Sequence, residues 1–150
     1  MRVSIGSDHA GFEQKQALVD YLVGKWYDVI DRGPDNDDRV DYPDYAALVA
    51  HDVADGVAER GVLVCGTGIG MSLAANKGKG IRCVACSEPY SARLSRAHNN
   101  ANMLALGARV LGSELAKDIV RIWLMTAFEG ERHARRVSMI DRLDRGEALE

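Results

Sequence analysis

The sequence predicts a three-layer α/β/α sandwich of Rossmann-like type, with a parallel sheet of about five strands and an extended C-terminal helix. Two observations support this fold class. Short apolar runs alternate along the chain with longer segments of helical period. Parallel strands need crossover connections, which are usually helices, so this repeated strand–helix unit indicates a parallel sheet. The 150 residues fit a single domain over residues 1–150, long enough to bury a core without disulfides or metal.

The predicted strands are the short apolar runs that end at polar or glycine-rich turns. They comprise residues 2–7, 27–31, 61–66, 81–86 and 102–107. In open parallel sheets, ligands bind beyond the carboxyl ends of the strands. The residues directly after each run are therefore the candidates for a functional site.

The predicted helices follow these strands. They comprise residues 12–25, 43–56, 70–78, 89–100 and 113–128. Pro89 suits the first turn of its helix, and Ser113 is a candidate N-cap for the last one. The tail after Gly130 is predicted to form a final charged helix. Because that helix has a sparse apolar face, we expect it to contact something other than its own core.

Composition and charge exclude several classes of function. A net charge of −3 gives no sign of the basic surface that nucleic-acid binding requires. No apolar run is long enough to span a bilayer, and the N-terminus lacks the apolar region of a signal peptide. Three cysteines do not make a disulfide framework, and reduced thiols are typical of the cytoplasm. The sequence therefore predicts a cytoplasmic protein that binds neither nucleic acid nor membrane.

Cys65 ends an apolar run and precedes the glycine-rich turn Gly66-Thr67-Gly68-Ile69-Gly70. Glycines allow backbone N–H groups to turn towards a ligand, and the helix that follows directs its positive end to the same place. The turn is thus a candidate anion site, and its field favours the thiolate form of the cysteine. The alternative is a buried cysteine at a strand end with a packing role only.

Several types of cysteine site do not fit this segment. A cysteine-dependent phosphatase would need an arginine where Met71 stands, and the turn lacks the Gly-Lys-Ser/Thr of a P-loop. Its Gly-x-Gly-x-Gly spacing is only a weak match to the dinucleotide pattern. Cys83 and Cys86 are predicted in one strand on opposite faces, which does not suit a redox or zinc pair. A thiolate beside an oxyanion site does suit proton abstraction next to a carbonyl, where an enediolate must be stabilised.

Other polar residues also follow predicted elements. Asp8 and His9 come after the first strand, where the alternative is an N-cap and a loop histidine. Residues 32–44 are polar, acidic and rich in breakers, as expected for a solvated loop, although Tyr42 is a candidate for facing a cleft. His98 and Asn99 lie near a helix end, where a surface histidine is the simpler interpretation.

The tail adds two basic side chains. Arg132 and Arg136 are four residues apart on one helical face. They form either a solvated basic face or a two-pronged clamp for a phosphate group.

Together, five long segments resemble the type B ribose-5-phosphate isomerases, to which galactose-6-phosphate and allose-6-phosphate isomerases are close. The segments are GSDHAGF, DYPDYA, CGTGIGMSLAANK, GIRCVACSEPYSARLSRAHNNANMLALGARV and EGERHARRV. The resemblance implies an aldose–ketose isomerase that interconverts ribose 5-phosphate and ribulose 5-phosphate. Isomerisation of a six-carbon sugar phosphate is the alternative. A sugar-phosphate-binding module without activity is a weaker one, because binding alone needs neither Cys65 nor His98.

The resemblance also implies a role for each matching residue. Cys65 corresponds to the catalytic base, and His98 to the acid that opens the furanose ring. Thr67 and the backbone of Gly66, Gly68, Ile69 and Gly70 correspond to the anion hole for the enediolate. Asp8 corresponds to the group near O1 and O2 of the open sugar, and His9 to its neighbouring ligand. The remaining matches are the binding residues Asn99 and Arg109 and the phosphate clamp of Arg132 and Arg136; Tyr42 is a further candidate for substrate binding.

The resemblance further implies a homodimer with shared active sites, or a tetramer. His98, Asn99 and Arg109 would then serve the cleft of the partner subunit. Glu131 stands where a glycine is common in the family. No cluster of metal ligands is visible, and the glycine turn supplies the positive field that a metal would provide, so we expect neither a metal nor a cofactor.

Overall fold

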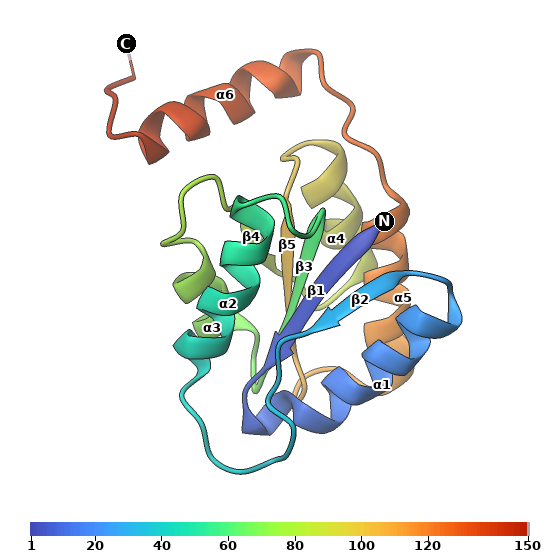
Figure 1. Cartoon of the computed structure of the whole chain (residues 1–150). Coiled ribbons are helices and arrows are strands. Elements are labelled where there is room, and N and C mark those ends of the chain that lie inside the picture. The colour runs from blue at the N-terminus through green and yellow to red at the C-terminus, as the bar shows by residue number, and fades with distance from the viewer. Residues whose placement is uncertain (150) are drawn as a thin grey trace.

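The computed structural model describes residues 1–149 and contains one five-stranded sheet in which every neighbouring pair of strands is parallel. The strands are β1 (Arg2–Ser7), β2 (Asp28–Asp31), β3 (Arg60–Cys65), β4 (Cys83–Ala85) and β5 (Met103–Gly107), in the spatial order β2-β1-β3-β5-β4. Helices cover both faces of the sheet (Figure 1). The predicted α/β/α fold class is therefore confirmed.

The six predicted helices occur where the sequence places them, with small shifts at their ends, and a short 3-10 helix that was not predicted precedes the first of them. They are the short 3-10 helix η1 (His9–Gly11), α1 (Phe12–Gly24), α2 (Tyr42–Ala54), α3 (Ile69–Ala75), α4 (Pro89–Ala97), α5 (Ser113–Met125) and α6 (Arg132–Asp144). The predicted N-cap of α5 is wrong by one residue, because Gly112 has the extended cap conformation and Ser113 is the first helical residue. The same helix ends at Met125, since Thr126 returns to extended backbone.

Two apolar clusters make up the core, one on each face of the sheet. The first lies between the sheet and α1, α4 and α5, and the second lies under α2 and α3. Alternate residues of β3 and β5 belong to opposite clusters, as the two-residue period of a strand requires. Val62, Val64, Leu104 and Leu106 belong to the first; Leu63, Cys65, Met103 and Ala105 belong to the second.

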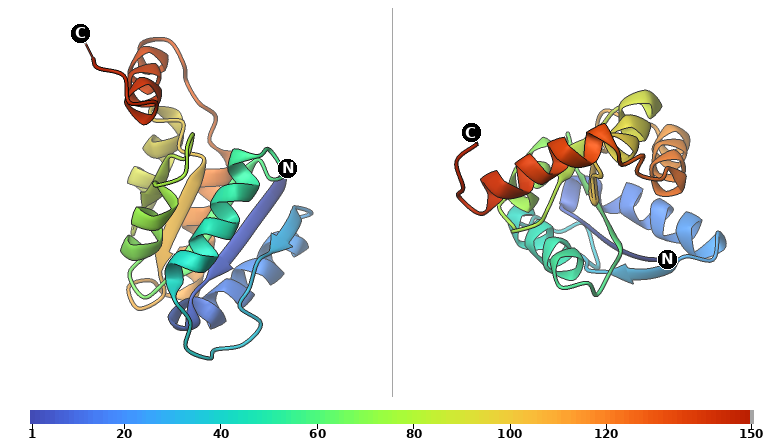
Figure 2. Two further views of the ribbon diagram at one scale, coloured as in Figure 1. Left: turned by 60° about the vertical axis from the view of Figure 1, so that its left-hand side comes forward. Right: turned by 90° about the horizontal axis from the view of Figure 1, so that it is seen from above.

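α6 contributes no residue to either core cluster. It lies across the end of the sandwich at which the strands begin (Figure 2). Polar contacts join its C-terminal half to the segment before β4: Arg82 forms an ion pair with Asp141 at 2.9 Å, and the N–H of Gly80 donates to Asp144 at 2.7 Å. Within residues 1–149, no helix is both long and apolar enough to cross a membrane.

A polar network ties α2 to the sheet. The Asp52 carboxylate accepts a hydrogen bond from the buried Ser4 hydroxyl of β1 at 2.6 Å, and two more from Arg32 at 2.5 and 2.7 Å. The hydrogen bond from Arg32 is the main cause of a lowered pKa for Asp52. The ionised carboxylate is thus stabilised in the folded state.

Replacing Asp52 by alanine is expected to lower the free energy of unfolding by about 2–4 kcal/mol at neutral pH, because Ser4 and Arg32 lose their acceptor. The folded-state pKa of Asp52 is lowered, so its contribution is complete above the unfolded value of about 3.9 and is lost as the pH falls through the folded value. Urea denaturation of the wild-type and variant chains over a pH series measures both effects.

The control is Asp55→Ala, which removes an exposed carboxylate from the end of the same helix. It is expected to change the free energy of unfolding by less than about 0.5 kcal/mol. Equal losses for the two variants at neutral pH would contradict a specific role for the Asp52 network.

Candidate active site

The carboxyl ends of β1, β3 and β5 are neighbours in the sheet, so the residues that follow these strands gather at one edge. The Asp8 N–H donates to the Val64 carbonyl at 3.1 Å, and the Asp8 carboxylate accepts from the Gly11 N–H at 3.0 Å. A Cβ atom at Gly11 would lie 2.3 Å from the Val64 oxygen, so only glycine permits this approach. Asp8 therefore caps η1 and lies at the end of β3.

His9 borders the long loop between β2 and α2. Its Nδ1 accepts a hydrogen bond from the Val40 N–H at 3.3 Å. The start of that loop is held by Lys15, whose buried ammonium group donates to Asp31 at 2.7 and 2.8 Å and to the Pro34 carbonyl at 3.0 Å. A cavity of about 420 Å³ opens at this place, lined by Asp8, His9, Arg39, Val40, Asp41 and Tyr42.

Cys65 is the last residue of β3, and its side chain is almost fully buried. The Sγ atom accepts a hydrogen bond from the Gly68 N–H at 3.1 Å. Gly68 has a φ of 80° and precedes α3, so the left-handed backbone of this glycine directs its N–H at the sulfur. The N–H of Ile69 donates in the same way to the Thr67 hydroxyl at 3.3 Å. Two of the N–H groups predicted for the anion hole therefore contact side chains of the same turn.

Arg109 lies beside the cysteine turn of its own chain. Its N–H donates to the Gly66 carbonyl at 3.0 Å, and its guanidinium nitrogen Nη1 lies 3.3 Å from where a Cβ of Gly66 would stand. On the other side of the turn, the ring of Tyr42 covers Gly70, where a Cβ would lie 2.9 Å from the ring. A second cavity of about 320 Å³ adjoins Thr67 and Ile69, and is also lined by Ala85, Cys86, Ser87, Gly107 and Val110.

The other predicted site residues lie at the opposite end of the strands. His98 caps the C-terminus of α4, Asn99 follows it, and the exposed side chains of Arg132 and Arg136 stand on the first turns of α6. At about 3.3 Å per residue, β5 alone spans roughly 13 Å between the two ends. Arg109 thus lies apart from His98 and Asn99, although the resemblance groups the three together.

The cysteine cluster comprises Asp8, His9, Tyr42, Cys65, Gly66, Thr67, Gly68, Ile69, Gly70 and Arg109. The histidine cluster comprises His98, Asn99, Arg132 and Arg136, together with Glu129 and His133, which were not predicted from the sequence.

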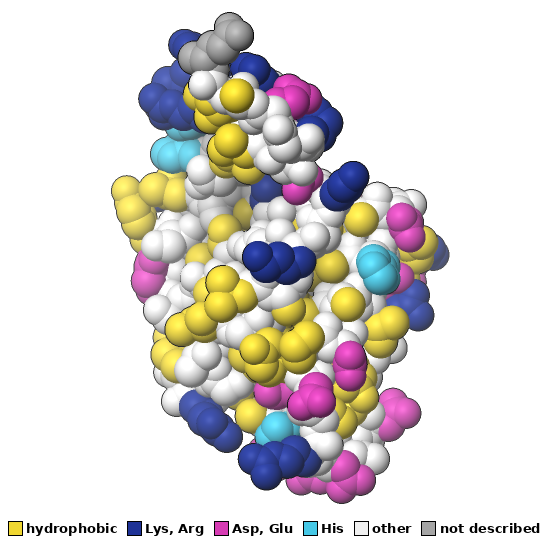
Figure 3. Space-filling model, turned by 90° about the vertical axis from the view of Figure 1, so that its left-hand side faces the viewer, with side chains coloured by type: hydrophobic (Ala, Val, Ile, Leu, Met, Phe, Trp, Pro, Cys, Tyr) yellow, Lys and Arg dark blue, Asp and Glu magenta, His cyan; other side chains and the backbone are white. Residues whose placement is uncertain are grey.

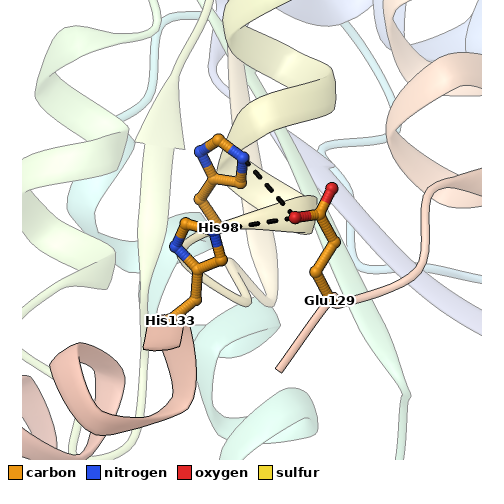
Figure 4. Close-up of side chains that lie close together, drawn as sticks. All are labelled: His98, Glu129 and His133. Carbon is orange, nitrogen blue, oxygen red and sulfur yellow. Dashed lines mark ion pairs between the residues drawn. The ribbon is translucent and has the colours of Figure 1, made fainter. Parts of the chain in front are cut away.

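Glu129 and His133 converge with His98 in the histidine cluster (Figure 4). The rings of His98 and His133 are stacked, with centroids 4.1 Å apart and planes 8° from parallel. The Nε2 atoms of His98 and His133 lie 3.8 and 3.6 Å from the same carboxylate oxygen of Glu129. Burial, and then the neighbouring His98, lower the pKa of His133, which favours its neutral form.

Glu131 begins α6 with an unusual backbone conformation. Its φ of 48° and ψ of −124° lie in a region that favours glycine, and Gly130 before it has a φ of 71°. The conformation explains why a glycine suits this position. The sharp turn redirects the chain so that His133 faces Glu129.

Comparisons with known proteins give consistent results. Residues 3–140 match the family model described as Ribose/Galactose Isomerase. The chain is 52% identical over 143 residues to ribose-5-phosphate isomerase B of Escherichia coli K12, covering 95% of this chain and 96% of the relative. A structure of the Clostridium thermocellum ribose-5-phosphate isomerase B superposes with a TM-score of 0.96 at 49% identity, covering 97% and 99% of the two chains. The Mycoplasma genitalium enzyme with bound ribulose-5-phosphate superposes with a TM-score of 0.92 at 39% identity, covering 96% of each.

Proposed function

The chain belongs to the ribose/galactose isomerase family, and we propose that it interconverts D-ribose 5-phosphate and D-ribulose 5-phosphate. Sugar phosphate isomerisation is the activity of its relatives, and it is the activity of this chain. The observation that carries the finer proposal is the Cys65 sulfur, which accepts the Gly68 N–H at the head of α3 and has the Arg109 guanidinium nearby. The proposal is supported by the ribulose-5-phosphate bound to the Mycoplasma genitalium enzyme.

Cys65 is the base in this mechanism. Its thiolate removes the proton from C2 of the open aldose, and the electron pair forms the C1–C2 double bond of a cis-enediolate. The same thiol then returns the proton to C1, which gives the ketose. Asp8 moves the proton between O1 and O2, so that no net charge is left on the sugar.

The enediolate oxygen needs donors that are already in place. Thr67 and the backbone N–H groups of the glycine turn supply them, and Arg109 adds a full positive charge beside Gly66. In this structure, the N–H groups of Gly68 and Ile69 contact Cys65 and Thr67. We expect these donors to shift to the substrate when the thiolate and hydroxyl turn towards it.

The histidine cluster opens the sugar ring and binds the phosphate group. His98 donates a proton to the ring oxygen while Asp8 accepts the proton of the O1 hydroxyl, which opens the furanose ring. Arg132 and Arg136 hold the phosphate group by charge-assisted hydrogen bonds, at the positive end of the thirteen-residue helix α6. Asn99 contacts the sugar beside His98.

A single chain cannot bring the two clusters to one substrate, because they lie at opposite ends of the strands. We therefore infer that the cysteine cluster of one chain meets the histidine cluster of a second chain, in a homodimer or in a tetramer built from such dimers. Exposed apolar side chains on α2 and α3, including Leu48, Ile69 and Leu73, support this contact. Figure 3 shows apolar side chains gathered on this face of the molecule.

Turnover of a series of sugar phosphates tests the proposed substrate. The expected order is ribose 5-phosphate well above allose 6-phosphate and galactose 6-phosphate, because the relatives that are 52% and 49% identical to this chain are ribose-5-phosphate isomerases. The family description also names galactose, so a six-carbon substrate is the second candidate. A higher kcat/KM with either six-carbon phosphate would overturn the proposed substrate but leave the isomerase chemistry intact.

A further inference from the structure

We propose that His98, Glu129 and His133 form a binding site for a Zn²⁺ ion, which inhibits the isomerase when it binds. The three side chains come from the end of α4, the connection after α5 and the first turn of α6 (Figure 4). Their ligand atoms all lie within 4.8 Å of one another. The inhibition rests on the proposed function of His98, whereas the binding does not.

The ligand set is the one that zinc prefers. Two imidazole nitrogens and one carboxylate bind Zn²⁺ in many catalytic sites, where a fourth position stays open to water. Mg²⁺ and Ca²⁺ are bound mainly through oxygen atoms, of which this cluster offers few. The exposed Arg132 and Arg136 on the same helix also oppose cations that are held by charge alone. The cluster therefore favours an ion that forms directional bonds with imidazole.

The spacing fits an ion better than it fits direct contact. The separations of 3.6 and 3.8 Å between each Nε2 and the Glu129 oxygen are too long for hydrogen bonds. Ligand atoms around a tetrahedral Zn²⁺ stand about 3.3–3.6 Å apart, given bonds of about 2.0–2.2 Å. The two separations from the Glu129 oxygen are within a few tenths of an ångström of that spacing.

His133 has a buried ring nitrogen without a hydrogen-bond partner in the described part of the chain, and a bound metal ion would pair with it. The residue is 5% exposed, and its Nε2 is buried without a hydrogen-bond partner among the described residues. Buried polar atoms are normally paired, and an unpaired ring nitrogen that faces a carboxylate is suited to a shared cation. Glu129 would supply the negative charge.

Binding requires one conformational change. The two rings are nearly parallel, so their in-plane lone pairs run side by side and do not yet meet at one point. The His98 ring must turn out of the stack, and its side chain, 34% exposed, has room to do so. The cost of opening the stack and the nearby arginines both weaken binding, as expected of an inhibitory ion and not of a resident cofactor.

Isothermal titration calorimetry with ZnCl₂ on the full, untagged chain tests the site directly. The wild-type chain is expected to bind a single Zn²⁺ per chain, and Glu129→Gln to weaken that binding by about tenfold or more. Glu131→Gln is the matched control, because it removes the same charge two residues away without touching the cluster. It should bind as the wild type does. Turnover of ribose 5-phosphate, measured in parallel, should fall as the site fills and recover with EDTA.

The outcomes separate the two proposals. Equal Zn²⁺ affinity in wild type and Glu129→Gln would overturn the site, as would binding that is lost only in Cys65→Ser, which would assign the ion to the thiol. Either result leaves the proposed isomerase function standing. Binding that depends on Glu129 but does not inhibit would establish the site and reject the inhibition, together with the role of His98 in ring opening.

Discussion

Replacing Cys65 by alanine is expected to abolish isomerisation of ribose 5-phosphate and leave its binding largely intact. The sulfur removes a carbon-bound proton but does not contact the phosphate, so its loss affects the transition state and not the ground state. Loss of an acid–base group typically lowers kcat by about 10²–10⁴-fold, and we expect the upper end here because the one sulfur serves both proton transfers of the proposed mechanism. Steady-state kinetics and calorimetric affinity for the substrate measure both quantities.

The other two cysteines provide matched controls. Burial raises the pKa of Cys83 to about 12 and that of Cys86 to about 11, so both are thiols at neutral pH. Cys86→Ala removes a partly buried sulfur near the same turn and should keep most of the turnover. A Cys65→Ala enzyme with near-wild-type kcat, or a Cys86→Ala enzyme as inactive as Cys65→Ala, would reject Cys65 as the base.

Mixing two inactive variants is expected to restore activity if each site draws on two chains. The first variant is Cys65→Ala. The second carries His98→Asn, Arg132→Ala and Arg136→Ala, which removes the acid and the phosphate clamp; each lost contact to the dianion is worth about 1.5–3 kcal/mol. In a mixed dimer, one site combines both defects and the other has none. Random pairing of equal amounts should therefore return about a quarter of wild-type activity.

A second mixture with an Arg109 variant is the control, because the structure places Arg109 beside Gly66 of its own chain. Cys65→Ala mixed with Arg109→Ala should recover nothing, since each site of the mixed dimer keeps one defect. Co-expression or joint refolding forms the dimers, and initial rates with ribose 5-phosphate report the recovery. No recovery from the first mixture, or equal recovery from both, would refute a site shared between chains in this way.

The strands and helices can be predicted from the sequence, whereas the order of the strands in the sheet cannot. Each strand was found because an apolar run ends at a turn, and β3 and β5 agree with the prediction to within one residue. β4 is shorter than predicted, with three residues, since its pairing with β5 extends only over Cys83–Ala85. The order of the strands depends on packing between distant segments, which no local pattern records.

The same limit applies to the site. Cys65 and the glycine turn can be predicted as a site, since a thiol, three glycines and the start of a helix are contiguous in the chain. The place of Arg109 beside Gly66 could not be predicted, because only the pairing of β3 with β5 brings the two residues together. Glu129 and His133 were missed because a Glu-x-x-x-His spacing is unremarkable until His98, from another helix, stacks on the second residue.

The attachment of α6 has a consequence for how the enzyme loses activity. Segments with few buried apolar contacts open at a lower free energy than the core, and their amides exchange with solvent first. α6 adds no residue to either core cluster and is held at its far end by the ion pair of Arg82 with Asp141. Such pairs weaken as salt rises. Substrate affinity, which this helix carries through Arg132 and Arg136 in the proposed mechanism, can therefore decline through local opening while the sheet beneath it is still fully folded.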